Sequence, residues 1–209
     1  MSGPDVEFWQ SKFEAAATPW DRGGPSPQLL SWMRDGTLST GPGLRRVVVP
    51  GCGNGHEVEA LARAGLEVTG VDYAPAAVER SRARLTGAGL PGAVERADVL
   101  AWAPPAPVDA VYEQTCLCAL HPDHWRAYAD ALHAWLRPGG RLFLLMMQMP
   151  RPGAAEGIIE GPPYHCDVNA VRALFPSSRW AWPKPPYARV PHPSGTLSEL
   201  ALVLERRPG

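Results

Sequence analysis

Residues 45–55 read RRVVVPGCGNG, and this stretch decides the fold. Its β-branched half predicts a buried strand over 45–49. After the stretch, apolar residues at helical spacing predict a helix over 57–63. The turn between them carries glycine at positions 51, 53 and 55. Glycine permits positive φ angles and lets backbone N–H groups approach a ligand with no Cβ in the way. The stretch therefore predicts a strand and a helix joined by a turn that lines a ligand site.

Downstream of this turn, short β-branched runs alternate with longer amphipathic runs. The remaining predicted strands cover residues 67–71, 93–97, 108–112, 142–147 and 197–204, the last of them antiparallel. The remaining predicted helices cover residues 75–85, 122–136 and 168–175. Such alternation is typical of a parallel sheet with helices on both faces. In such a sheet, ligands bind beyond the carboxyl ends of the strands, where the glycine turn lies.

Two segments do not follow this alternation. Residues 1–40 stand apart from the sheet pattern, with helices predicted over 6–16 and 27–34. Residues 180–193 are rich in proline and aromatic residues. This composition indicates either one wall of a substrate pocket or an irregular surface loop, and we favour the loop.

Length and charge exclude several classes of protein. At 209 residues the chain is short enough for one core, so we predict a single domain over 1–209, with an N-terminal segment over 1–40 and a core over 41–209. A net charge of -1, with no Lys/Arg-rich run, argues against a nucleic-acid partner. The longest apolar stretch, 142–147, is too short to cross a bilayer, and no signal-peptide pattern begins the chain. We expect a cytoplasmic monomer with reduced cysteines and no membrane contact.

Asp72 is the residue that narrows the ligand class. It ends the second predicted strand, 21 positions after Gly51, where a carboxylate can accept hydrogen bonds from both hydroxyls of a ribose. A dinucleotide fingerprint would need a third glycine where His56 stands, so that the helix could close on a pyrophosphate. S-adenosyl-L-methionine is an adenosine cofactor without phosphate, and it fits both observations. Asp98, at the end of the third predicted strand, is either a further polar contact near the adenine or a loop cap.

The histidines and cysteines near the fourth predicted strand do not predict a metal site. His121 and His124 have no partner ligands nearby in sequence, and His121 before Pro122 is better explained as the start of a helix. Cys116 and Cys118 alternate across the end of the strand, so we expect one to face the core and the other the pocket.

Short motifs spread over nearly the whole chain resemble those of a known family. They are Trp9, Pro19-Trp20-Asp21, Val49-Pro50-Gly51-Cys52-Gly53, Gly70-Val71-Asp72, Cys118-Ala119-Leu120 and Gly161-Pro162-Pro163-Tyr164. The motifs are similar to those of the thiopurine S-methyltransferase family, particularly its halide and thiol methyltransferase branch. The resemblance implies a Rossmann-like class I methyltransferase fold, with a seven-stranded, mostly parallel sheet, helices on both faces and an N-terminal helical lid.

The resemblance also implies roles for individual residues. Cofactor contacts are implied for Trp9, Phe13 and Trp20 in the lid, and for Gly51, Gly53, Asp72, Asp98, Val99 and Gln114 in the core. Gly51 would contact the methionine moiety and Asp72 the ribose, whereas Asp98 and Val99 would flank the adenine. Substrate contacts are implied for Trp20 and Tyr164, and Gln114 would border both cofactor and substrate.

Some of these residues have equally simple structural explanations. Trp9 is explained equally well by the burial of an N-terminal helix against the sheet. Tyr164 is explained equally well as a tyrosine that packs within its loop. Two positions depart from the family pattern, because relatives carry tryptophan at Phe13 and tyrosine or arginine at Gln114. Phe13 keeps an aromatic face. Gln114 lacks the phenol or the cation, so we do not extend a thiopurine specificity to this chain.

These observations predict methyl transfer from S-adenosyl-L-methionine to a small soft nucleophile, with a thiol favoured. Such a displacement cancels charge, so alignment of the reactants and exclusion of water are the main requirements. Soft nucleophiles need little or no base, and the sequence presents no compelling His/Asp pair. We therefore expect no indispensable catalytic residue, with Gln114 as a candidate orienting residue. The alternatives are halide methylation, a nicotinamide-dependent oxidoreductase, which His56 argues against, and a protein that binds S-adenosyl-L-methionine without catalysis.

Overall fold

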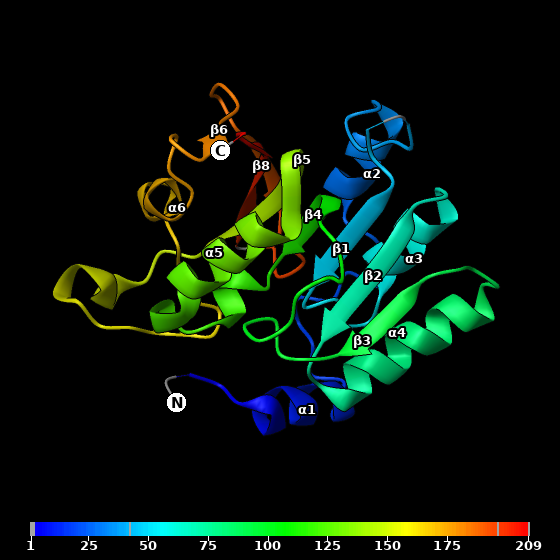
Figure 1. Ribbon diagram of the computed structural model, residues 1–209. Helices are drawn as coiled ribbons and strands as arrows, with labels where there is room; N and C mark the ends of the chain where they lie inside the picture. The colour runs from blue at the N-terminus through cyan, green and yellow to red at the C-terminus, as the bar shows by residue number, and fades with distance from the viewer. Residues whose placement is uncertain (1–2, 42, 196, 209) are drawn as a thin grey trace.

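The computed structural model describes residues 3–41, 43–195 and 197–208 (Figure 1). Residues 1, 2 and 209 of the predicted domain lie outside the described residues, as do 42 and 196. The strands are β1 Arg46–Pro50, β2 Glu67–Asp72, β3 Ala93–Arg96, β4 Val108–Gln114, β5 Leu136–Gln148, β6 Trp180–Ala181, β7 Ala188–Pro191 and β8 Ser198–Arg206. The helices are α1 Val6–Glu14, α2 Pro27–Arg34, α3 His56–Arg63, α4 Pro75–Gly87, α5 Trp125–Trp135 and α6 Val168–Leu174, with short 3-10 turns η1 Leu117–Ala119, η2 Pro122–His124 and η3 Pro152–Glu156.

One mixed sheet organises these elements. Its order is β3-β2-β1-β4-β5-β8-β6, and β7 also pairs with β8. Strands β1 to β5 run parallel to one another, and β8 is antiparallel to β5. This order confirms the Rossmann-like fold and the antiparallel last strand. The sheet has eight strands rather than the seven predicted, because β6 and β7 pair with opposite ends of β8 and share its outer edge.

The alternation of side chains along the strands gives the sheet two apolar faces. In β1, Val47 and Val49 pack toward α2, α3 and α4, whereas Val48 packs toward α5 and α6. In β5, Phe143 packs on the side of α2, α3 and α4, and Leu144 packs on the side of α5 and α6. Figure 1 shows the same layers, with α5 and α6 on one side of the sheet and α3 and α4 on the other. Helices therefore cover both faces, as predicted.

Several boundaries differ from the sequence predictions. Helix α1 ends at Glu14 because Ala16 has a φ angle of 51°, and a left-handed residue cannot continue a right-handed helix. Strand β5 begins well before the predicted 142–147, because Leu136 already pairs with Val108. The next pair joins Arg141 to Ala110, so the intervening residues form an irregularity within the strand instead of the loop that was expected there.

The prediction of an irregular loop over 180–193 is wrong. The segment contains both β6 and β7, which hydrogen-bond to β8. An outer strand presents a row of unpaired backbone N–H and C=O groups, and short segments that pass along it can pair with them. The free edge of β8 therefore orders a stretch whose own sequence favours loop structure.

Helix α1 lies across the carboxyl edge of the sheet, below the ends of β1 and β2 in Figure 1. Two contacts hold it on α4: the backbone N–H of Ala76 donates to Oε1 of Gln10 (2.9 Å), and Arg80 donates to the carbonyl oxygen of Phe13 (2.6 Å). The N-terminal segment therefore covers the edge at which such sheets bind ligands. Among the helices that the structure describes, none is long and apolar enough to cross a membrane.

Candidate functional site

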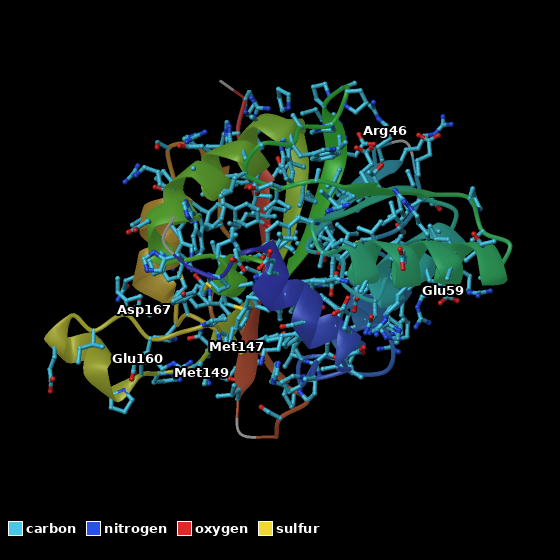
Figure 2. The ribbon with its side chains drawn as sticks, turned by 90° about the horizontal axis from the view of Figure 1, so that it is seen from below. Arg46, Glu59, Met147, Met149, Glu160 and Asp167 are labelled. Carbon is cyan, nitrogen blue, oxygen red and sulfur yellow. The ribbon has the colours of Figure 1, made fainter. Side chains whose placement is uncertain are left out.

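A cavity of about 900 Å³ lies at the carboxyl edge of the sheet. Its walls come from the N-terminal segment, the glycine turn, the ends of β2, β4 and β5, and the turn after β7. All the predicted cofactor positions line it: Trp9, Phe13, Trp20, Gly51, Gly53, Asp72, Asp98, Val99 and Gln114. Figure 2 shows this edge from below, with α1 in front and with Met147 and Met149, which also line the cavity, near the end of β5.

The glycine turn takes the conformation that its sequence requires. Gly51, Gly53 and Gly55 have φ angles of 59°, 50° and 76°, all in the left-handed region that favours glycine. A Cβ at Gly51 would lie 3.0 Å from both Cβ and Sγ of Cys116, so a side chain there would be crowded as well as strained by the positive φ angle. The backbone of the turn can therefore face a ligand directly.

Asp72 ties the end of β2 to this turn. Its Oδ2 accepts a hydrogen bond from the backbone N–H of Gly53 (3.0 Å), and its Oδ1 accepts one from the N–H of Ala74 (3.0 Å). Burial raises the pKa of Asp72, and these backbone hydrogen bonds only partly offset the increase. A carboxylate has more lone pairs than these two amides use. Asp72 can therefore still accept hydrogen bonds from the hydroxyl groups of a ligand.

The aromatic residues Trp9, Phe13 and Trp20 form a cluster over the cavity, which we call the aromatic lid. Trp20 lies edge-on to Trp9 and to Phe13, with ring centroids 5.6 Å and 6.1 Å apart. Trp9 is partly buried against Phe13, Ala74 and Ala77, and it also lines the cavity. Burial and ligand contact, the two explanations open for Trp9, are therefore compatible.

Asp21 holds the N-terminal segment on the glycine turn. Its carboxylate accepts a hydrogen bond from the side-chain amide of Asn54 and lies 3.0 Å from Nε2 of His56. Burial opposes ionisation, but hydrogen bonds from Gly23 and Asn54 and the nearby His56 outweigh it and lower the pKa of Asp21. Burial and the charge of Arg84 lower the pKa of His56. This His/Asp pair was not predicted, because its members meet only when the N-terminal segment folds over the turn.

Arg22 holds the same segment on the opposite half of the sheet edge. Its Nη2 lies 2.8 Å from Oε2 of Glu199, and its Nη1 donates to the carbonyl oxygen of Pro191 (2.8 Å). Glu199 is fully buried, and burial raises its pKa. The charge of Arg22 and the hydrogen bonds from Gln114 and Arg22 only partly offset this increase. Arg22 thus offsets a charge that would otherwise be buried without a partner.

Gln114 is bonded at both ends of its amide. Its Oε1 accepts a hydrogen bond from the hydroxyl of Tyr112 (2.9 Å), and its Nε2 donates to Glu199 (3.2 Å). Although Gln114 lines the cavity as predicted, its side chain mainly connects the core to the Arg22–Glu199 pair. We call Arg22, Gln114, His192 and the buried Glu199 the polar corner of the cavity.

The chain turns sharply after β4. Thr115 has a φ angle of 61°, which is unusual for a β-branched residue. Glu113 stabilises this turn by accepting a hydrogen bond from the backbone N–H of Leu117 (2.6 Å), and burial raises the pKa of Glu113 to about 8. Because the strand has already ended, Cys116 and Cys118 do not alternate across it. Both line the cavity, and Cys116 also packs in the apolar core beneath α5 and α6, as was expected of one of the two cysteines.

Tyr164 lies beside the cavity. Its ring packs edge-on to His121, with centroids 5.4 Å apart, and its backbone N–H donates to the carbonyl oxygen of Cys118 (2.7 Å). Within the described ranges, Pro162 and Pro163 of the same loop line the cavity and Tyr164 does not. The contacts shown are those of a tyrosine packed within its loop.

Asp98 and His121 both act as local caps. Oδ1 of Asp98 accepts from the backbone N–H of Leu100 (2.9 Å), and Nδ1 of His121 accepts from that of Asp123 (3.3 Å). The helix start predicted at His121 is confirmed. Asp98 is at once a loop cap and part of the cavity wall, so both of its predicted explanations remain open.

Apart from Gln114, the residues of the polar corner were missed by sequence reasoning. His192 comes from the stretch interpreted as a surface loop, yet it lines the cavity and is only 6% exposed. One signal was available, since the carboxylate of Glu199 lies inside the last predicted strand, directly before its apolar run 200–204. A buried carboxylate requires a partner, and this requirement points to a cation from another segment.

Comparisons with known proteins agree with this geometry. A family model described as thiopurine S-methyltransferase matches residues 4–184. The Arabidopsis thaliana protein named "Probable thiol methyltransferase 2" is 34% identical over 179 residues, which cover 84% of this chain and 74% of that protein. "Thiocyanate methyltransferase 1" of the same plant is 31% identical over 171 residues, which cover 80% of this chain and 70% of that protein.

A solved structure of similar fold is that of Burkholderia thailandensis 1,6-didemethyltoxoflavin-N1-methyltransferase, which has S-adenosylhomocysteine bound. It is 18% identical and superposes with a TM-score of 0.75 over 97% of this chain and 87% of that one. At this identity the likeness concerns the fold alone, and it supports the class I methyltransferase architecture.

Gly55→Ala tests the close approach of the glycine turn to α4. An added Cβ would lie 2.8 Å from Cα of Ser81 at a φ angle of 76°, so we expect a loss of about 2–4 kcal/mol in the free energy of unfolding. Gly89→Ala is a matched control, because its φ angle is 63° and nothing lies within 4 Å. The control should lose only roughly 1–2 kcal/mol. Urea denaturation measures both variants, and equal losses would contradict the crowding at Ser81.

Glu113→Gln tests the buried carboxyl group behind β4. The fold raises the pKa of Glu113 from 4.5 to about 8, so its stabilising effect is complete below 4.5 and is lost as the pH rises through 8. Between these values, rising pH should destabilise the wild type relative to Glu113→Gln, by on the order of 5 kcal/mol. The free energy of unfolding across this window measures the effect. A difference that stays constant with pH would show that Glu113 does not titrate there.

Proposed function

Since the chain belongs to the thiopurine S-methyltransferase family, we propose that its methyl acceptor is a small organic thiol. As a member of that family, the chain is a methyltransferase that uses S-adenosyl-L-methionine. The alternatives of a nicotinamide-dependent oxidoreductase and of a binding protein without catalysis are therefore wrong. The choice among acceptors depends on the chemistry and size of the cavity.

The cavity walls fit S-adenosyl-L-methionine. Gly51 and Gly53 line the cavity, and Asp72 keeps lone pairs for the ribose hydroxyls. We assign Asp98 and Val99 to the adenine and the aromatic lid to the sulfonium, where cation–π attraction contributes roughly 0.5–2 kcal/mol for each ring. Bound in this way, the cofactor supplies an electrophilic methyl group on sulfur.

The names of the family and of the relatives favour a sulfur acceptor over a halide. These names refer to thiopurines, thiols and thiocyanate, each of which contains sulfur. Sulfur nucleophiles are polarisable and react well with a sulfonium methyl group without strong activation. A thiol is therefore the simplest acceptor that is consistent with all three names.

The size of the cavity is the observation that carries the proposal of an organic thiol. Pockets of roughly 300–1,000 Å³ hold one drug-sized ligand. At about 900 Å³ this cavity lies near the upper end of that range, so it has room for an acceptor of several heavy atoms beside the cofactor. A halide or a thiocyanate ion would leave much of that space unfilled. Leu120, Met147 and Pro162 supply apolar wall for the body of such a thiol.

The residues of this chain contribute alignment and the exclusion of water. Asp21 and Arg22 hold the N-terminal segment over the cavity, and orientation alone can lower a barrier by on the order of 7–11 kcal/mol. A thiolate needs no general base in the transfer step, and the Asp21–His56 pair is engaged in holding the segment. Gln114 acts as a positioning residue through its hydrogen bond to Glu199.

Asp72→Asn tests the cofactor half of the site. The change keeps the size of the side chain but removes its charge and one of its acceptor oxygens. We expect the Kd for S-adenosyl-L-methionine to rise at least tenfold, because hydrogen bonds to charged groups contribute roughly 1.5–3 kcal/mol. Asp130→Asn is the control, since its side chain lies on α5 and is 54% exposed. If calorimetry gave the same Kd for Asp72→Asn and the wild type, the ribose assignment would be wrong.

The acceptor itself is tested by turnover with labelled S-adenosyl-L-methionine. Hydrosulfide, an aromatic thiol, a thiopurine and iodide are offered separately at equal concentration. We expect the aromatic thiol to be methylated with a kcat/KM at least tenfold above that of iodide, because it fills the apolar space beside the cofactor. Methylation of iodide alone would establish a halide methyltransferase, and no product from any thiol would sink the proposal.

A further inference from the structure

Two buried hydrogen-bond donors at the polar corner have no partner. In the part of the chain that the structure describes, the buried side-chain atoms without a hydrogen bond are Arg22 Nε, Tyr128 Oη, Arg151 Nε, His192 Nε2 and Arg206 Nε. Of these residues, only Arg22 and His192 line the cavity. An unpaired buried donor is costly, so its presence in the wall of a binding cavity marks a place where a bound molecule can supply the missing acceptor.

The topology of the sheet puts His192 on the acceptor side of the cavity. Strand β7 is antiparallel to β8, which is antiparallel to β5, so β7 ends at the same edge as β1, β4 and β5. His192 directly follows β7, just as Gly51 follows β1. The adenosine positions Asp72 and Asp98 follow or end the strands on the other side of β1. His192 therefore stands on the far side of β4 from the adenosine half.

The hydrogen bonds of His192 define which ring nitrogen carries the proton. Its Nδ1 accepts from the backbone N–H of Ser194 (3.2 Å) and lies 3.0 Å from the hydroxyl oxygen of the same residue. Burial lowers the pKa of His192, and the charge of Arg22 lowers it further. The ring is therefore neutral near neutral pH, and because Nδ1 is an acceptor, Nε2 carries the hydrogen.

Arg22 provides the second donor without adding net charge. Its two terminal nitrogens are bonded to Pro191 and Glu199, which leaves Nε–H unpaired. The buried carboxylate of Glu199 offsets the guanidinium charge. A corner with two donors and a balanced charge suits a neutral acceptor, such as a carbonyl oxygen, better than a bare anion.

We propose that Nε2–H of His192 and Nε–H of Arg22 form a subsite for a neutral hydrogen-bond acceptor on the body of the thiol substrate. The subsite rests on the proposed function, since it presumes an organic thiol beside the cofactor. His192 is then a specificity residue. It selects thiols that carry a carbonyl group and helps to orient their sulfur toward the methyl group.

The subsite is tested with two thiols of matched shape, meta-acetylthiophenol and meta-ethylthiophenol. They differ in one carbonyl oxygen, so the ratio of their kcat/KM values reports the hydrogen bonds at the polar corner. For the wild type, the ratio should favour the acetyl compound by at least about tenfold. A ratio near one in the wild type overturns the subsite, and this measurement does not depend on any variant.

Variants at His192 separate a specific contact from a structural role. His192→Phe keeps a ring but removes the donor, so the ratio should fall toward one while the Kd for S-adenosyl-L-methionine stays unchanged. His192→Gln places an amide N–H near the position of Nε2 and should restore part of the ratio. The control His133→Phe lies on α5, beside Trp180, and should leave the ratio unchanged. Equal loss of kcat/KM for both thiols in His192→Phe would overturn the specificity role.

Binding without turnover distinguishes this subsite from the proposed function. The S-methylated products of both thiols are titrated into the protein loaded with S-adenosylhomocysteine. If the acetyl product binds more tightly than the ethyl product and His192→Phe abolishes the difference, the subsite is supported. This holds even if neither thiol is methylated. The lack of methylation would then count only against the proposal that the methyl acceptor is a thiol. Equal binding of both products by the wild type overturns the subsite even if both thiols are methylated.

Discussion

The ion pair between the partly buried Arg22 and the buried Glu199 is the interaction on which the closed cavity depends. The two residues are 177 positions apart, and Nη2 of Arg22 lies 2.8 Å from Oε2 of Glu199. A buried pair gains little overall, because both charges lose their water, but removing one partner costs about 3–5 kcal/mol. The pair therefore specifies where the N-terminal segment lies more than it stabilises the sheet.

The neighbouring residues Asp21 and Arg22 connect one segment to both halves of the sheet edge. Asp21 contacts Asn54 and His56 at the glycine turn, whereas Arg22 contacts Glu199 in β8. In the proposed function, the first half binds the adenosine of the cofactor, and the second half offers hydrogen-bond donors to the methyl-accepting substrate. One closed segment thus completes both walls together, which suits a reaction that depends on alignment and dry surroundings.

Local patterns predicted most elements of the fold, and their limits are equally physical. Helix α2 matches its prediction at both ends, because Ser26 caps it and a proline begins it. Strands β6 and β7 were missed because they are short and lie in a proline-rich stretch, and they form only where β8 leaves an edge to pair with. Cys116 and Cys118 lie beyond the end of β4, because the chain turns at Thr115, so strand alternation is not the reason that Cys116 is buried in the core.

The sequence by itself predicted the residues that we assign to the cofactor. The glycine turn can be recognised locally, because its positive φ angles favour glycine. Asp72 can be placed beside it, because β2 is parallel to β1 and ends at the same edge of the sheet. Only the tertiary structure decided the acceptor half. Nothing in the local sequence around Arg22, His192 or Glu199 shows that they meet, because their contacts arise when burial removes water from a charge and forces it to find a partner. Whether a residue is buried depends on the packing of segments that are far apart in the sequence, so no single segment reveals it.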